Sequence, residues 1–299
     1  MFPIIPANTA TASGNDEGVF GYGRTASYFS LTNLVSNAGV VATDVAGAGT
    51  ARRNPAACEY GEDKGIFGFG MTAAAYLDET NLVSNTGVVS SDVVGVGSDR
   101  RSLAACSYGD DKGIFGFGYT GAYVAITNLV TNAGVVGGDV AGVGTARQYP
   151  AATQYGGDKG IFGFGFDASS NLSKTNLVSN TGVVASDQAA ETGTARYGLA
   201  ACSYGDDKGI FGFGSGVTNV TNLVSNTGVV ASDTAGVGTS RDQLAACEYG
   251  GDKGIFGFGS GATGYTNVTN LVSNTGVVAS DQAATTGTAR YGLAACSFN

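Results

Sequence analysis

The sequence has 299 residues and a formal net charge of −9, with 50 Gly, 4 Pro, no His and no Trp. This length allows one large domain or two small ones, and the abundant Gly between short apolar runs favours a single domain of many short strands joined by tight turns. Without His, the commonest general base and the imidazole metal ligand are missing, so we expect no enzyme and no cofactor. No cluster of Lys and Arg is present that would neutralise a row of phosphates, which argues against nucleic acid as a partner.

The first 14 residues, MFPIIPANTATASG, lack the basic start and the long apolar run of an export signal. No later run is long and apolar enough for a membrane-spanning helix, so we expect neither a signal peptide nor membrane insertion. We interpret residues 1–14 as a lead segment and residues 15–299 as one domain.

An internal repeat dominates the rest of the chain. An apolar segment, GIFGFG or a variant of it, has its first Phe at Phe20, Phe67, Phe115, Phe162, Phe211 and Phe256. A second segment, TNLVSNTG or a variant, has its first Asn at Asn33, Asn81, Asn128, Asn176, Asn222 and Asn270. Six markers of each kind indicate six units, each 45 to 49 residues long.

Each unit contains four candidate strands. In chain order these are LAACSY, which ends at a GDDK turn, then GIFGFG, then VTNLVS after a variable loop, and finally VVASD after an NTG turn. Gly and Asn tolerate positive φ, so such turns between runs of β-formers are hairpin signals. Four short strands in about 47 residues are typical of a β-propeller blade.

The two ends of the sequence complement each other. Residues 291–299 form a first strand with no second strand after it, whereas residues 15–23 form a turn and a second strand with no first strand before them. We therefore predict an all-β fold: a six-bladed β-propeller of four-stranded antiparallel blades, closed by pairing of the C-terminal strand with the N-terminal strand. The alternative is an open solenoid, which would instead have atypical capping units at both ends.

The Arg before LAAC and the run IFGFG, present across the six units, resemble the kelch type of β-propeller repeat. The paired Gly of kelch is replaced here by Gly-Phe-Gly, and the characteristic Trp is absent. The nearly copied segments NLVSNTGVVASD and DKGIFGFG also resemble those of repeat proteins encoded by bacteriophages. These resemblances imply a binding or structural protein.

One Asp and one Arg recur in every unit, before and after the return loop that leads to the next unit. Catalysis needs one asymmetric group of residues, so we interpret both sets as structural. The spacing leaves open whether each Asp pairs with an Arg or accepts hydrogen bonds from the loop backbone. The two sets are Asp44, Asp92, Asp139, Asp187, Asp233 and Asp281, and Arg52, Arg100, Arg147, Arg196, Arg241 and Arg290.

Five cysteines share one repeat position, which holds Thr153 in the third unit: Cys58, Cys106, Cys202, Cys247 and Cys296. We expect small, buried, reduced thiols, because equivalent positions of neighbouring units should lie too far apart for a disulfide. A ring of metal-binding thiolates is the alternative, but the local spacing of zinc sites is absent. Calcium bound at the GDDK turns is a second metal-binding alternative, but each such turn carries a Lys beside its acidic residues. We expect no metal.

Aromatic residues mark the candidate binding face. The loops between the second and third strands vary in length and sequence, and with the return loops they should emerge on the face opposite the uniform GDDK and SNTG turns. The alternative is that these aromatic side chains only cover the outer strands. The candidate ligand-binding residues, in or directly beside these loops, are Tyr28, Phe29, Tyr76, Tyr119, Tyr123, Phe166 and Tyr265.

Two functions are consistent with this sequence. The first is a non-enzymatic bacteriophage virion component, such as a tail-fibre or head-decoration module, that contacts other virion proteins or a host-surface protein or glycan. The second is a cellular, cytoplasmic kelch-like module that binds another protein. The residues themselves do not identify the ligand.

Overall fold

A computed structural model of the chain describes residues 16–188, 192–216, 218–282 and 286–298. In these residues the chain is all-β, with no helix and therefore none that could cross a membrane. The lead segment predicted at residues 1–14 lies outside the described residues.

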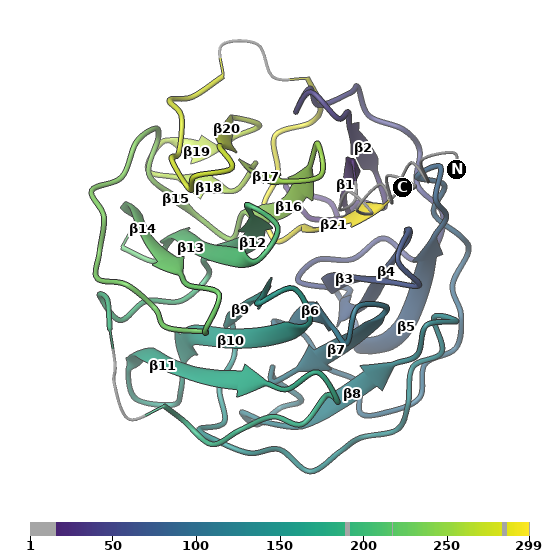
Figure 1. Cartoon of the computed structure of the whole chain (residues 1–299). Helices are drawn as coiled ribbons and strands as arrows, with labels where there is room; N and C mark the ends of the chain where they lie inside the picture. Colours follow the sequence, from purple (N-terminus) through teal and green to yellow (C-terminus); the bar gives the residue numbers. More distant parts are fainter. Residues whose placement is uncertain (1–15, 189–191, 217, 283–285, 299) are drawn as a thin grey trace, which may run out of the picture.

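Each repeat contributes three strands to an antiparallel sheet. The inner strands, nearest the centre of the molecule in Figure 1, are β3 (Ala56–Tyr60), β6 (Ala104–Tyr108), β9 (Ala151–Tyr155), β12 (Ala200–Tyr204), β16 (Ala245–Tyr249) and β21 (Ala294–Phe298). The middle strands are β1 (Glu17–Gly21), β4 (Lys64–Met71), β7 (Lys112–Gly116), β10 (Lys159–Phe166), β13 (Lys208–Gly214) and β17 (Lys253–Gly257). The outer strands are β2 (Thr32–Val35), β5 (Tyr76–Val83), β8 (Thr127–Val130), β11 (Asn171–Val178), β14 (Thr218–Val224) and β20 (Thr269–Val272).

These strands form six separate repeat sheets, which lie side by side around the centre of the molecule (Figure 1). Each inner strand contacts the inner strand of the next repeat, in the order β3, β6, β9, β12, β16, β21 and back to β3. We call the line through this centre the axis. A further small sheet in the described residues joins β15 (Arg241–Asp242), β18 (Ser260–Gly261) and β19 (Gly264–Tyr265).

The prediction of a six-bladed β-propeller with four-stranded blades is wrong. In the described residues every sheet has three strands, and none of the sheets is closed. The segment expected as the fourth strand does not form one: in the repeat where it reads VVSSD, Val89 makes an isolated bridge to Val83 of the outer strand, and Val93, directly after the segment, makes one to Thr80.

A difference in spacing explains why the fourth strand does not form. Between those two bridges the outer strand advances from Val83 to Thr80, whereas the returning segment advances one residue further, from Val89 to Val93. The additional residue interrupts the ladder, as in a β-bulge. The segment uses its polar side chains for contacts with the loop of a neighbouring repeat instead, and its Val88 is 66% exposed.

The two ends of the described chain share one sheet, of order β2-β1-β21. In it, the C-terminal strand β21 pairs antiparallel with β1, from Glu17 opposite Phe298 to Gly21 opposite Ala294. This is the pairing that the complementary ends of the sequence predicted, within a sheet of three strands rather than four.

The core lies between neighbouring sheets, and two glycines of each middle strand make this packing close. A Cβ on Gly113 of β7 would stand 2.5 Å from Cys58 Sγ of the preceding repeat, and one on Gly116 would stand 2.7 Å from the ring of Phe162 in the following repeat. No larger residue fits at either position without moving its neighbour. The two glycines of the Gly-Ile-Phe-Gly segment therefore set the distance between sheets.

Candidate ligand-binding face

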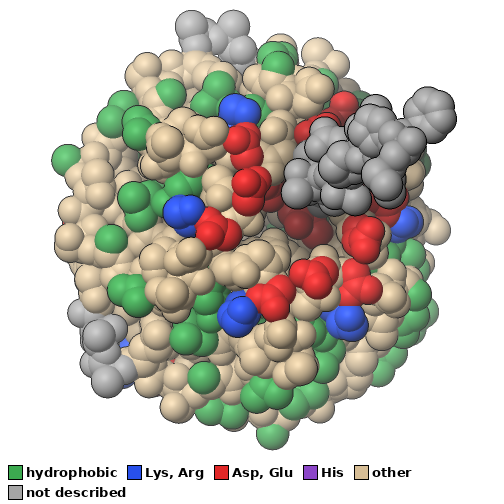
Figure 2. Space-filling view, in the orientation of Figure 1, with side chains coloured by type: hydrophobic (Ala, Val, Ile, Leu, Met, Phe, Trp, Pro, Cys, Tyr) green, Lys and Arg blue, Asp and Glu red, His purple; other side chains and the backbone are tan. Residues whose placement is uncertain are grey.

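The uniform turns lie together on one face, which we call the turn face. In the second repeat, Asn132 of the SNTG-type turn donates a hydrogen bond of 3.0 Å to Asp111 of the GDDK turn. Asn180, Asn226 and Asn274 make the same bond to Asp158, Asp207 and Asp252. Figure 2 shows acidic side chains, with Lys and Arg among them, around a hollow at the centre of one face. Each Lys of these turns is ion-paired with the Asp before it, as Lys208 is with Asp207.

The opposite face, which we call the variable face, has a ring of backbone hydrogen bonds around the axis. The residue two positions before each inner strand donates its N–H to the carbonyl of its equivalent in the preceding repeat, over 2.7 to 3.2 Å. All six have positive φ, which directs the amide and the carbonyl toward the two neighbouring repeats. This axial ring consists of Asn54, Ser102, Tyr149, Gly198, Gln243 and Gly292.

The side chains of the axial ring differ from repeat to repeat although the backbone does not. Together with a layer of Pro and Leu side chains below them, they line a pocket on the axis. Asn54 Nδ2 donates to Tyr149 Oη at 3.1 Å and to Ser102 Oγ at 3.3 Å. Gln243 Oε1 is shielded from solvent and has no hydrogen-bond partner in the described residues. The pocket therefore offers amide and hydroxyl groups beside apolar walls.

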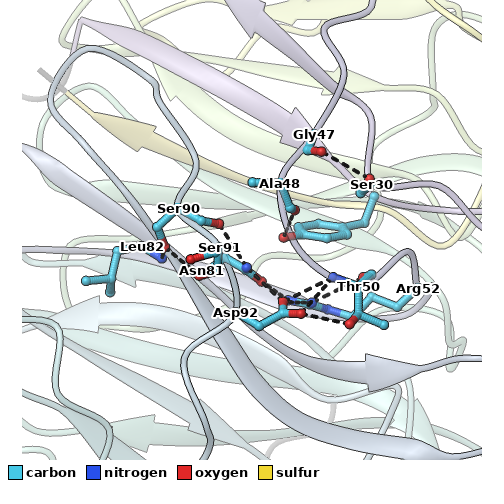
Figure 3. Close-up of polar contacts among 11 residues, drawn as sticks. Ser30, Gly47, Ala48, Thr50, Arg52, Asn81, Leu82, Ser90, Ser91 and Asp92 are labelled. Atoms are coloured by element: carbon cyan, nitrogen blue, oxygen red, sulfur yellow. Dashed lines mark hydrogen bonds and ion pairs between the residues drawn. The ribbon is translucent and has the colours of Figure 1, made fainter.

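A polar network that recurs from repeat to repeat links each return loop to the outer strand of the next sheet (Figure 3). Asp92 accepts bonds of 2.9 Å from Thr50 N and 2.7 Å from Thr50 Oγ1, and a bond of 3.0 Å from Asn81 Nδ2. Arg52, which is fully buried, donates to Asn81 Oδ1 at 2.6 Å and lies 3.5 Å from Asp92 Oδ1. Each Asp thus binds a loop backbone and faces an Arg, but both belong to the return loop before its own sheet and not to the one that follows it: Arg52 faces Asp92, and Asp44 faces Arg290.

The charges of this network depend on each other. Burial acts to raise the pKa of Asp139, but hydrogen bonds from Ser98 and Asn128 and the charge of Arg100 outweigh it and lower the pKa. Burial lowers the pKa of Arg100 to about 10, against the effect of Asp139. Both groups remain charged at neutral pH. The network anchors each return loop, because Asp139 contacts Ser98 of the loop that precedes Arg100.

Four of the predicted aromatic residues form a continuous row. Ring centroids are 6.1 Å apart for Tyr76 and Tyr119, 5.3 Å for Tyr119 and Tyr123, and 6.0 Å for Tyr123 and Phe166. The row continues to Tyr197, 5.6 Å from Phe166. Edge-to-face and tilted contacts of this kind hold the rings in fixed orientations. Because these four side chains are only partly buried, the row presents aromatic surface to solvent.

The other three predicted aromatic residues lie elsewhere on this face. Tyr265 is 46% exposed and stacks on Tyr291 with centroids 4.8 Å apart. Tyr28 lies under the guanidinium of Arg24, 4.9 Å from its ring centroid. Phe29 follows Tyr28 and is partly buried, and its N–H bonds the carbonyl of Gly23.

Sequence reasoning missed the residues that connect these aromatic groups to the axial pocket. They are Arg24, Arg53, Arg101, Tyr149, Tyr197, Tyr291, Asn54 and Gln243. Most occupy the two positions directly after the repeated Arg, which read Arg-Asn, Arg-Ser, Gln-Tyr, Tyr-Gly, Asp-Gln and Tyr-Gly in the six units. Variation at two positions inside a nearly uniform repeat was the signal that would have identified them.

The other end of the axis has a second pocket, lined by the inner strands. Burial raises the pKa of Glu59, although hydrogen bonds from Ser297 and Ser107 oppose the shift. Burial also raises the pKa of Glu248, with a contribution from the charge of Glu59, and Ser203 Oγ donates to Glu248 at 2.8 Å. These polar side chains contact one another, and they occupy the repeat position that follows the cysteines.

The five cysteines are buried free thiols. Each packs against the first Gly of the following repeat's middle strand, as Cys202 does against Gly254, and Thr153 fills the same place against Gly209. Burial raises the pKa of Cys202. In the described part of the chain, no group of three or more His, Cys, Asp and Glu is placed to hold a metal ion.

No protein-family model matches this sequence, and comparison with curated proteins gives no match.

Proposed function

We propose that the chain is a non-catalytic binding protein that holds its ligand on the variable face. The observation that carries this proposal is a set of shielded polar atoms without hydrogen-bond partners. Of eight such side-chain atoms in the described residues, five belong to residues at this face: Arg24, Arg53, Arg101, Gln148 and Gln243. Buried polar atoms are normally paired, so unpaired ones on one face call for an explanation, and a bound ligand that rearranges these side chains would supply their partners.

The aromatic row supports the same face. Tyr and Phe offer large contact areas with little loss of side-chain entropy, and here each ring is already held by the next. On the described part of the turn face, each Lys is instead ion-paired with the Asp before it, and Asn side chains bond those same Asp residues.

The setting in which the protein binds is a finer proposal. We propose a bacteriophage particle, where the variable face would contact a virion protein or a host-surface protein or glycan. This rests on the resemblance of the uniform repeats alone. A cellular module that binds another protein is the second candidate, supported by the kelch resemblance. Capsid and tail genes beside the gene would favour the first.

The test of the binding face compares variants of the two faces. Fluorescently labelled protein is applied to glycan and protein arrays, and each hit is measured again with Tyr76→Ala, Tyr123→Ala and Tyr265→Ala. An aromatic contact at the centre of an interface contributes about 2 kcal/mol or more, so we expect roughly thirtyfold weaker binding for at least one variant. Asp207→Ala, on the turn face, is the control and should bind like the wild type.

Melting curves must first show that each variant is folded. A ligand that still binds all three aromatic variants but no longer binds Asp207→Ala would place the site on the turn face and contradict the proposal. An array on which the wild type gives no specific hit would contradict a binding role for these ligand classes.

A further inference from the structure

Three arginines of the variable face differ from the other Lys and Arg side chains in their ion pairs. The sequence has 15 Lys and Arg residues. Eleven of them have a carboxylate within 4.0 Å: the residues Lys64, Lys112, Lys159, Lys174, Lys208, Lys253, Arg52, Arg100, Arg147, Arg196 and Arg290. Arg241 is fully buried and donates to three oxygen acceptors. Arg24, Arg53 and Arg101 remain, with no ion pair to any described residue.

These three arginines contact Tyr291 and Tyr149, which belong to or directly precede the axial ring. Arg53 donates to Tyr291 Oη at 2.9 Å, and the backbone of Arg24 pairs with that of Tyr291. Arg101 donates to Tyr149 Oη at 3.3 Å, and Asn54 Nδ2 bonds the same hydroxyl. The side chains of Arg53 and Arg101 thus belong to one connected sector of the face, and Arg24 joins it through its backbone.

Aromatic rings hold the guanidinium groups in place. Arg101 lies 4.9 Å from the ring centroid of Tyr119 and 5.6 Å from that of Tyr76, and Arg53 lies 5.8 Å from that of Tyr291. Cation–π contacts of this kind stabilise the position of a charge without neutralising it. The Nε atoms of all three arginines are shielded and unpartnered in the described residues. We call Arg24, Arg53, Arg101 and the tyrosines they contact the Arg–Tyr arc.

We propose that the Arg–Tyr arc binds an anionic saccharide, with its carboxylate or sulfate groups on the arginines and its sugar rings against the tyrosines. This deepens the proposed function and rests on it. Guanidinium groups recognise planar or tetrahedral oxyanions through paired hydrogen bonds. The amide and hydroxyl groups of the axial pocket match a ligand rich in hydroxyl groups.

An acidic peptide is the competing ligand class, and the residues of the pocket favour the saccharide. Asn54, Ser102 and Tyr149 place uncharged amide and hydroxyl groups in the lining of the axial pocket, whereas a peptide of several carboxylates calls for further cations. In the described part of the chain, three arginines that are not fully buried have no ion pair, and the net charge of the sequence is −9. Long polyanions are disfavoured for the same reason.

The experiment measures binding of the whole chain to four probes by calorimetry: galacturonate tetrasaccharide, a sulfated tetrasaccharide from heparin, neutral galactose tetrasaccharide and tetra-aspartate. We expect binding of at least one of the two anionic saccharides, weaker at higher NaCl because salt screens exposed charges. Arg53→Gln and Arg101→Gln should each weaken it about tenfold or more, and Arg101→Lys should restore only part of the loss. The two anionic probes distinguish carboxylate from sulfate recognition.

Lys208→Gln is the matched control, since it removes one positive charge from the turn face, and it should bind like the wild type. Failure of both anionic saccharides to bind, or unchanged binding by both Gln variants, would overturn the inference. Tighter binding of tetra-aspartate would overturn it in favour of an acidic peptide. Binding of the neutral tetrasaccharide alone would also overturn it, yet the proposed function would stand if Tyr123→Ala weakened that binding.

Discussion

The turn face and the variable face are built by the same six repeats and differ in how they use charge. On the turn face, each Lys lies beside an Asp, and the Asp side chains bond the Asn of the adjacent turn. On the variable face, the backbone repeats while the side chains do not, and Arg24, Arg53 and Arg101 have no carboxylate partner in the described residues. Positions that hold the sheets together repeat, because each junction between sheets has the same geometry. Side-chain positions that do not contribute to these junctions differ from one repeat to the next.

Removing the last strand tests how far both faces depend on complete packing of the sheets. Deletion of residues 291–299 should lower the melting temperature by about 10 °C or more, or cause aggregation, because it removes β21, exposes the edge of β1 and takes Gly292 from the axial ring. Thermal melting and light scattering measure this. A peptide of the deleted segment should restore part of the stability. Wild-type melting of the truncated chain would contradict the role assigned to this pairing.

Two aspartates sharpen the comparison between a repeated network and a surface turn. Asp139→Ala should lower the free energy of unfolding by about 3 kcal/mol, because it leaves the buried Arg100 without its carboxylate. Asp207→Ala, on the turn face, should change it by no more than about 0.5 kcal/mol. Urea denaturation at pH 7 measures both. Because the pKa of Asp139 is lowered by folding, its contribution should be lost as the pH falls toward and below 3.8. Equal effects of the two substitutions would contradict the distinction.

Substitution of Glu248 tests how the charge of a buried carboxyl group near the turn face affects stability. Folding raises its pKa, so the folded state binds the proton more tightly than the unfolded state does, and the charge opposes folding at neutral pH. Glu248→Gln should therefore increase stability at pH 7 by on the order of 1 kcal/mol, the usual cost of an imperfectly satisfied buried charge. The gain should vanish below pH 4.5, the ordinary pKa of the carboxyl group. Glu62→Gln, in an exposed turn, is the control. A loss of stability at pH 7 would show that the charge is structurally required.

The smallest effect is expected at the shared cysteine position. Cys202→Thr should change the free energy of unfolding by less than about 1.5 kcal/mol, because Thr153 already occupies the equivalent place against Gly209. Chemical denaturation under reducing conditions measures this. The five thiols should also be unreactive in the folded protein, as their burial raises the pKa of Cys202 and its equivalents. Rapid labelling of the native protein by a thiol reagent would contradict this interpretation.

The sequence by itself determined the number of repeats, the all-β class, the hairpin turns and the pairing of the two ends. Each of these follows from local signals: Gly and Asn at turns, alternating apolar residues in strands, and a half-unit at each end that lacks a strand. The aromatic candidates of the variable loops were found in the same way, and the structure places Tyr76, Tyr119, Tyr123 and Phe166 in one row.

Only the tertiary structure decided that the fourth segment is not a strand and that Arg24, Arg53 and Arg101 are unpaired. VVASD reads as a strand because Val favours one, but its register against the outer strand depends on where Asp92 must reach the neighbouring loop. An arginine's partners likewise lie far from it in sequence: Arg52 meets Asp92 across 40 residues, and Arg53, its immediate neighbour, meets no carboxylate in the described chain. Charge pairing depends on distances in the folded chain, which no local sequence pattern contains.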